Sequence, residues 1–230
     1  MQNILIIGGS SGVGLSLVER LKNRFNIIST YNNNPITSIK NVTYQHYNVL
    51  TSDVEELNVP ESLNGIVYCP GSINLKPFNR YSEKELLDDI KINVIGFLKI
   101  LSSYKNKLLN GENPSVVLFS SVAATKGIPF HTQVAFSKGA IESVAKTLAA
   151  ELAPKIRVNV VAPSLLETPL SAKFLNTETK VENNIKRHPL KKIGEPSDIS
   201  SVVDFLLSEN AKWMTGQIIH VDGGISTLSN

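Results

Sequence analysis

The chain has 230 residues, a formal net charge of +3, 42% hydrophobic residues and 19% charged residues. These values are typical of a single globular domain over residues 1–230, and so small a charge does not indicate a nucleic-acid partner. No apolar run has the length of a membrane span, and the N-terminus lacks a secretory-signal pattern. The lone cysteine, Cys69, and the four scattered histidines have no metal-ligand spacing. We therefore expect a cytoplasmic protein that binds no metal, no membrane and no nucleic acid.

A glycine-rich turn separates the first predicted strand from the first predicted helix. The strand is Asn3–Ile7, the turn is 8–14, and apolar residues at helical spacing follow from Leu15. Glycines let the main chain approach a ligand closely, and the amides at a helix N-terminus favour an anion. The pattern predicts a binding site for the pyrophosphate of a dinucleotide. The residues expected to contact it are Gly8, Ser10, Ser11, Gly12, Val13 and Gly14.

Short β-branched runs alternate with helical patterns along the rest of the chain. The expected strands are Asn3–Ile7, Asn26–Thr30, Val42–Tyr44, Gly65–Cys69, Ser115–Phe119, Arg157–Val161 and Gln217–Val221. The clearest helices begin at the capping-box residue Ser82, near Val134 and at Pro196. The alternation predicts an α/β fold with one Rossmann-like, doubly wound parallel sheet of about seven strands and helices on both faces. The longest irregular stretch, about 164–196, is the expected substrate lid.

The residues after the second predicted strand bear on the choice of coenzyme. Ligands of such sheets bind beyond the carboxyl ends of the strands, where an acidic residue would bind the ribose 2′-hydroxyl of NAD. Tyr31 and Asn32 stand there instead, and Glu19 is the only acidic residue before Asp53. The scarcity of acidic residues in this part of the chain favours NADP slightly, because NADP carries an additional 2′-phosphate. No arginine follows the strand, so NAD stays open.

Several motifs have the order and spacing of one enzyme family. They are the turn glycines, Gly71, Asn93, Ser121, Ser137-Lys138, Pro163, Thr168, Gly216-Gln217 and 221–224. On these motifs the chain resembles the classical short-chain dehydrogenase/reductase family over nearly its whole length. The resemblance implies an oxidoreductase that uses NADP or NAD to act on a carbonyl, alcohol or enoyl group of a small molecule. It also implies a homodimer or homotetramer.

The resemblance also implies roles for individual residues. Ser121 and Lys138 match catalytic positions, and Asn93 matches the asparagine that holds a water linked to the lysine. Further coenzyme contacts are implied at Asn48, Val49, Gly71, Lys138, Pro163 and Thr168.

One departure from the family pattern concerns the proton donor. The family's active-site tyrosine stands four residues before the lysine, and this chain has Val134 there. General acid catalysis supplies roughly 10²–10⁴-fold, so valine at this position would slow ordinary carbonyl reduction. His131 stands seven residues before Lys138, at the spacing of the tyrosine in the enoyl-acyl-carrier-protein reductase branch. Its imidazole either serves as the acid or simply lines the cleft.

Three functions stay open on this pattern. The first is an oxidoreductase with an altered proton donor, which would be His131, Ser121 or a water. The second is a catalytically degenerate dinucleotide-binding sensor or assembly subunit. The third is a dehydratase or isomerase on the same fold. Leucines in the expected lid, including Leu165, Leu166 and Leu170, favour a partly apolar substrate.

Overall fold

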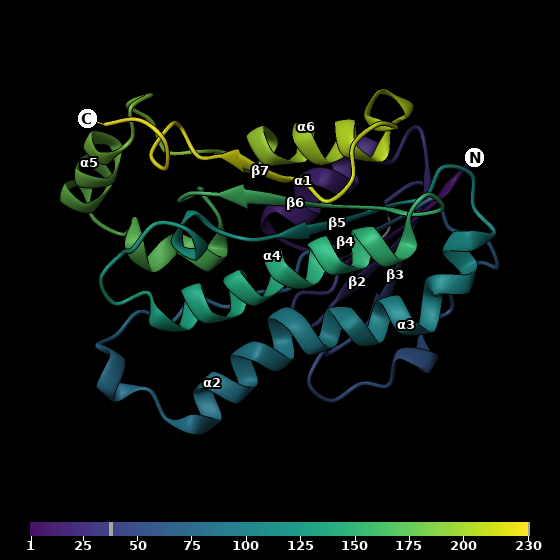
Figure 1. Ribbon diagram of the computed structural model, residues 1–230, viewed down its shortest axis with the longest axis horizontal. Helices are drawn as coiled ribbons and strands as arrows, with labels where there is room; N and C mark the ends of the chain where they lie inside the picture. The colour runs from purple at the N-terminus through teal and green to yellow at the C-terminus, as the bar shows by residue number, and fades with distance from the viewer. Residues whose placement is uncertain (37–38, 230) are drawn as a thin grey trace.

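A seven-stranded parallel sheet forms the centre of the protein (Figure 1) in the computed structural model, which describes residues 1–36 and 39–229. The strand order is β3-β2-β1-β4-β5-β6-β7, and every neighbouring pair is parallel. The strands are β1 (Asn3–Ile7), β2 (Asn26–Tyr31), β3 (Val42–His46), β4 (Gly65–Tyr68), β5 (Ser115–Phe119), β6 (Arg157–Pro163) and β7 (Ile218–Val221). The predicted α/β sheet is confirmed, and the predicted strand ends differ from the observed ends by two residues at most.

Helices cover both faces of the sheet (Figure 1). The helices of one face are α1 (Gly12–Leu21) and α6 (Pro196–Leu207), and those of the other are α2 (Glu83–Ile90), α3 (Gly96–Leu109) and α4 (Thr132–Leu152). Side chains of a strand alternate between the faces. Ile4 and Ile6 therefore join the core beneath α1 and α6, whereas Leu5 and Ile7 join the core beneath α3 and α4. Both cores are apolar, which explains why the central strands have no polar face.

A π-helical turn, η3 (Lys91–Ile95), joins α2 to α3. The apolar spacing from Ser82 predicts a continuous helix, and the expected capping box is present, since Ser82 N donates to Glu85 Oε2 at 2.9 Å. The Tyr68 hydroxyl donates to Ile92 O at 2.6 Å within the wide turn. Single π turns are frequent at functional sites because they re-aim side chains.

The expected lid contains two short helices, η5 (Pro169–Phe174) and α5 (Glu178–Arg187). Two backbone hydrogen bonds close the base of the segment: Glu167 N donates to Gly194 O at 2.9 Å, and Gly194 N donates to Leu165 O at 3.2 Å. Helix α5 lies at one end of the molecule, near the C-terminus (Figure 1). The role of a lid stays a prediction.

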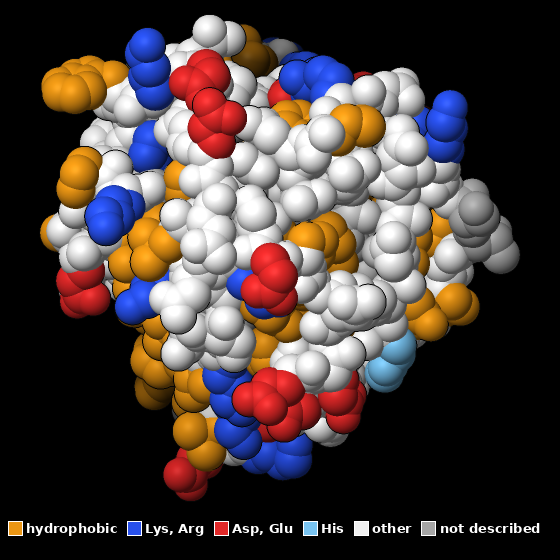
Figure 2. All heavy atoms as spheres, turned by 90° about the vertical axis from the view of Figure 1, so that its right-hand side faces the viewer, with side chains coloured by type: hydrophobic (Ala, Val, Ile, Leu, Met, Phe, Trp, Pro, Cys, Tyr) orange, Lys and Arg blue, Asp and Glu red, His pale blue; other side chains and the backbone are white. Residues whose placement is uncertain are grey.

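The surface at the amino ends of the strands carries acidic and basic side chains interspersed among polar ones (Figure 2). Within the described ranges, no helix is both long enough and apolar enough to cross a membrane.

Candidate active site

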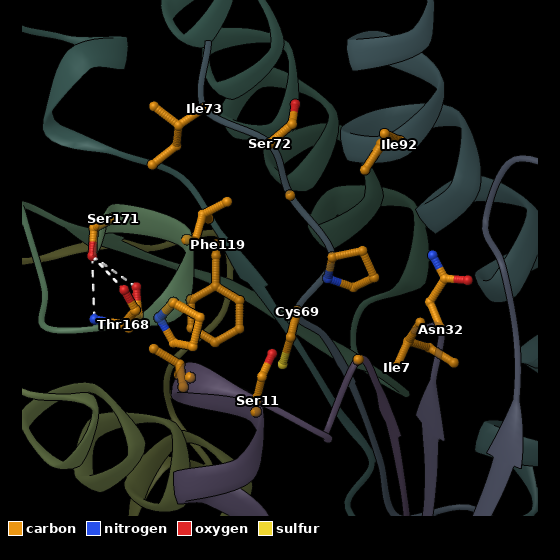
Figure 3. Close-up of a pocket in the computed structure, with 18 of the residues that line it drawn as sticks. Ile7, Ser11, Asn32, Cys69, Ser72, Ile73, Ile92, Phe119, Thr168 and Ser171 are labelled. Atoms are coloured by element: carbon orange, nitrogen blue, oxygen red, sulfur yellow. Dashed lines mark hydrogen bonds between the residues drawn. The ribbon is translucent and has the colours of Figure 1, made fainter. Parts of the chain in front are cut away.

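A cavity of about 530 Å³ opens at the carboxyl ends of the strands, where the fold class places ligands. Its volume is within the usual range for small-molecule sites. Asn32 lies at one end, Thr168 and Ser171 lie at the opposite end, and Cys69 and Phe119 lie between them (Figure 3). The expected site residues that line it are Gly8, Ser10, Ser11, Gly12, Val13, Gly14, Asn32, Asn48, Val49, Gly71, Ser121, Lys138, Pro163 and Thr168.

The glycine turn presents main chain to this cavity. Gly8 and Gly12 have φ values of +80° and +51°, in the region that favours glycine. A Cβ on Gly14 would lie 2.2 Å from Gly8 O, so only glycine lets α1 begin this close to the turn. The N-cap residue Ser11 makes no side-chain hydrogen bond to the helix. Ser11 and the first residues of α1 line the cavity, and the start of a helix with unpaired amides is suited to an anion.

Amide side chains occupy the end of the cavity beyond β2 and β3. Asn32, Asn33 and Asn34 all line it. Asn48 also lines it, although its Oδ1 accepts a hydrogen bond from Leu50 N at 2.9 Å and so stabilises its own turn. Tyr31 is not among the lining residues; its ring packs edge-on against His46, with 5.7 Å between the ring centroids.

Ser121 and Lys138 both line the cavity. Ser121 follows β5 and caps a short turn, where its Oγ accepts a hydrogen bond from Ala123 N at 3.2 Å. Lys138 extends from α4, and its Nζ donates to Phe119 O at 3.0 Å. Val134, one helical turn earlier, also lines the cavity and is buried. Its isopropyl group can neither donate nor accept a proton.

Asn93 lies behind the wall of the cavity and is 1% exposed. The π turn directs it inward, and its Nδ2 donates to Asp89 O and to Asp89 Oδ1, both at 3.0 Å. A Cβ built on Gly71 would lie 3.4 Å from Asn93 Oδ1 and 3.5 Å from Lys138 Nζ. The structure therefore brings the asparagine and the lysine to the same side of Gly71, as the family pattern implies.

Burial sets the ionisation of two groups in this region. It lowers the pKa of Lys138 to about 8, against the opposing effect of the Asp89 and Cys69 charges. It raises the pKa of the Cys69 thiol to about 12, and Lys138 opposes that shift. The lysine is thus near its titration point at neutral pH, whereas the thiol is not ionised there.

His131 lies apart from these groups. It precedes α4, and its Nδ1 lies 2.8 Å from Pro129 O in its own loop. It does not line the cavity that Val134 and Lys138 line.

Two polar pairs near the cavity were not expected from the sequence. The Ser164 hydroxyl lies 2.8 Å from His188 Nε2, and His188 Nδ1 lies 2.7 Å from Asn184 O, so this pair connects the end of β6 to α5. Ser72, which lines the cavity, donates to Asp89 Oδ1. The sequence holds no local signal for either pair, because each joins segments that are distant along the chain. Among the described residues, no cluster of His, Cys, Asp or Glu could hold a metal ion.

Comparison with known proteins identifies the family. The profile of the enoyl-(acyl carrier protein) reductase family matches residues 44–226. A tropinone reductase homolog of Arabidopsis thaliana is 30% identical over 96% of this chain and 78% of its own length. A 3-oxoacyl-[acyl-carrier-protein] reductase of Thermotoga maritima is 35% identical over 64% of this chain and 59% of its own length. A short chain dehydrogenase family protein of Francisella tularensis superposes with a TM-score of 0.90 at 27% identity, covering 99% of this chain and 100% of that one.

The parallel sheet and the glycine turn at the head of the cavity are features of a dinucleotide-binding oxidoreductase class. The chain belongs to the NAD(P)-dependent short-chain dehydrogenase/reductase family.

Proposed function

We propose that the protein is an NAD(P)-dependent oxidoreductase that acts on a carbonyl or alcohol group of a small, partly apolar molecule with an altered proton donor. One observation carries this proposal: a single cavity joins the glycine turn to Ser121 and Lys138. A coenzyme along that cavity would have its pyrophosphate at the turn and its nicotinamide near the lysine. Two relatives are named as reductases, and one name specifies a 3-oxo group, which supports carbonyl reduction.

The residues fit a nicotinamide dinucleotide on structural grounds. A Cβ on Gly14 would collide with the turn, and the first amides of α1 are aimed at the space that a pyrophosphate needs. Lys138 and Thr168 both line the cavity, which supports a role for Lys138 in binding the nicotinamide ribose and for Thr168 near the carboxamide. When bound, the coenzyme supplies the hydride.

NADP is the slightly preferred coenzyme in this proposal. Among the residues that the structure describes, no Asp or Glu lines the cavity, so none of their carboxylates would repel a 2′-phosphate. The donors near that end are the neutral amides of Asn32, Asn33 and Asn34. Calorimetric titration with NADPH and NADH tests the preference, and tighter binding of NADH would overturn it.

The proton donor is the altered part of the site. With Val134 in place of a phenol, the candidates are Ser121, His131 and a water held near Lys138. Ser121 and Lys138 line the cavity, which supports a donor at their side, whereas His131 lies outside the lining residues. Reduction rates of Ser121→Ala and His131→Ala distinguish the candidates. The variant that lacks the proton donor should lose activity, and the other variant should keep it.

The substrate end of the cavity is apolar. Its lining includes Ile73, Phe119, Leu165, Leu166 and Leu170. This surface supports an alkyl or ring-bearing substrate. A panel of ketones and alcohols with either coenzyme tests the activity, using Lys138→Met as the negative control. Rates at background across the panel, with coenzyme binding intact, would instead support a catalytically silent dinucleotide-binding sensor or subunit, which Val134 favours.

The proposal includes a homodimer or homotetramer. Apolar side chains of η3, α3 and α4 are exposed, namely Ile95, Leu98 and Phe136. Such residues favour contact with a second copy. Light scattering of the purified protein tests this, and a monomer at micromolar concentration would contradict it.

A further inference from the structure

Asp89 is a buried carboxylate beside the active site, in a helix whose other acidic side chains are more exposed. It is 2% exposed, whereas its neighbour Asp88 is partly exposed and forms an ion pair with Lys84. A carboxylate is rarely buried to this degree without hydrogen bonds or a counter-charge. The surroundings of Asp89 provide the hydrogen bonds.

Two segments converge on the Asp89 carboxylate. Ser72, from the loop after β4, donates to Oδ1 through its hydroxyl. Asn93, from the π turn, donates to the same oxygen at 3.0 Å through Nδ2. With Nδ2 held in this way, Asn93 Oδ1 is left to face Gly71 and Lys138 Nζ. Asp89 therefore fixes which way the Asn93 amide points.

Two buried oxygens of this cluster accept no hydrogen bond from the described part of the chain: Asp89 Oδ2 and Asn93 Oδ1. Both are acceptors, and Asn93 Oδ1 lies near the same Cβ position of Gly71 as the ammonium group of Lys138. Burying such acceptors costs free energy unless a hydrogen-bond donor or a cation lies close to them. The cluster is thus arranged to stabilise positive charge at Lys138.

The other groups around Lys138 do not supply that counter-charge. The pKa of Cys69, raised to about 12 by burial, leaves the thiol neutral. Glu142, one turn further along α4, accepts a hydrogen bond from Ser120 Oγ at 2.6 Å, and it is not among the groups whose charge acts on Lys138. Asp89 and Cys69 are the groups whose charge acts on Lys138, which leaves Asp89 as the anion.

We propose that Asp89 is a positioning residue of the active site, orienting the Asn93 amide and supplying the counter-charge to the Lys138 ammonium. The proposal rests on the proposed function for its catalytic consequence, but the charge arrangement is a property of the free protein. This role explains why the Asp89 carboxylate is buried and why the Ser72 hydroxyl donates to it. A lysine kept cationic is what a coenzyme ribose and a developing substrate oxyanion require.

Titration of Lys138 in the coenzyme-free protein tests the proposal directly. Protein labelled with ¹³C at lysine Cε is titrated by NMR, and the Lys138 signal is assigned by its loss in Lys138→Met. In Asp89→Asn, which keeps the shape but removes the charge, the Lys138 midpoint should fall by about one pH unit. In the matched control Asp88→Asn, the midpoint should stay at the wild-type value.

An unchanged Lys138 midpoint in folded Asp89→Asn would overturn the proposal. The alkaline limb of the pH–rate profile should move with the NMR midpoint, a shift that a purely structural role would not produce. A flat coenzyme titration of the wild-type protein would overturn the proposed function instead, and the lysine titration would still decide the role of Asp89.

A measurement on the wild-type protein covers the case in which Asp89→Asn does not fold. The ¹³C shift of the Asp89 side-chain carboxyl reports whether that group is ionised. The proposal requires a carboxylate at pH 7. A protonated Asp89 at that pH would overturn it, because a neutral acid gives Lys138 no counter-charge.

Discussion

The two ends of the cavity are built by different means. At the coenzyme end, the glycine turn between β1 and α1 offers main-chain amides, and its geometry depends on residues within one short segment. At the catalytic end, Asp89 and Asn93 lie one helical turn apart in α2 and η3, whereas Lys138 extends from α4 and comes near them only in the folded chain. At the first end the residue type is constrained, since a Cβ on Gly14 would collide with the main chain of the turn. The second end depends on individual side chains, and Val134 is one of those that line the cavity there.

The largest effect is expected from introducing a phenol at position 134. Val134→Tyr would place a proton donor beside Lys138, and the reduction rate with a carbonyl substrate should rise by roughly 10²–10⁴-fold. Val134→Phe is the matched control, because it adds the ring without the hydroxyl. Equal rates for the two variants would show that the missing phenol does not limit this site.

The next prediction concerns the ionisation of Lys138. Its pKa is lowered from 10.5 to about 8, so the folded protein loses this proton before the unfolded chain does. Below pH 8 the protonated Lys138 destabilises the folded state by its full desolvation free energy. Between pH 8 and 10.5 the folded protein loses this proton, and the destabilisation disappears. Relative to Lys138→Met, the unfolding free energy of the wild type should therefore rise with pH, by about 3 kcal/mol at most.

Urea denaturation of both proteins between pH 7 and 10.5 measures this difference. Lys146→Met, on an exposed position of the same helix, is the control and should show no such rise. A difference between the wild type and Lys138→Met that is independent of pH would contradict the burial of the ammonium.

A methyl group at the coenzyme end should weaken coenzyme binding. In Gly14→Ala the new Cβ would lie 2.2 Å from Gly8 O, so α1 must move away from the turn. Overpacking of this kind costs about 1–3 kcal/mol, which corresponds to a fall in affinity of roughly 5- to 160-fold. Gly139→Ala is the matched control, because nothing lies within 4 Å of its Cβ position. Unchanged affinity in Gly14→Ala would refute the close approach at this turn.

The smallest effect is expected at Cys69, between the two ends. Burial raises the pKa of its thiol to about 12, so the nucleophilic thiolate is scarce at pH 8. Iodoacetamide should leave the folded protein unmodified, as measured by intact mass, and should alkylate it once in urea. Rapid alkylation of the folded protein would show that this thiol is ionised.

The sheet was predictable from the sequence because its signals are local. Buried parallel strands such as Ser115–Phe119 need continuous apolar runs, and the capping box at Ser82 marks the start of a helix within four residues. The glycine turn is equally local. These elements agree with the sequence-based expectation to within two residues.

The catalytic end was less predictable for a physical reason. The π turn at Lys91–Ile95 leaves the apolar spacing intact, so the sequence indicates one unbroken helix. Asp89 stands next to Asp88 in an acidic helix and resembles a residue of a solvated face. Its burial follows from Ser72 and Asn93, and the contact with Ser72 exists only after the β4 loop has packed against the helix.

Isothermal titration calorimetry of the wild-type protein and Gly14→Ala with NADPH and NADH is the most direct test of the central claim. That claim is a nicotinamide dinucleotide held by the turn at Gly8–Gly14, with its reactive end at Lys138. We predict saturable binding of at least one coenzyme to the wild type, with one site per chain, and clearly weaker binding to the variant. Traces without heat for both coenzymes in the wild type would contradict the account.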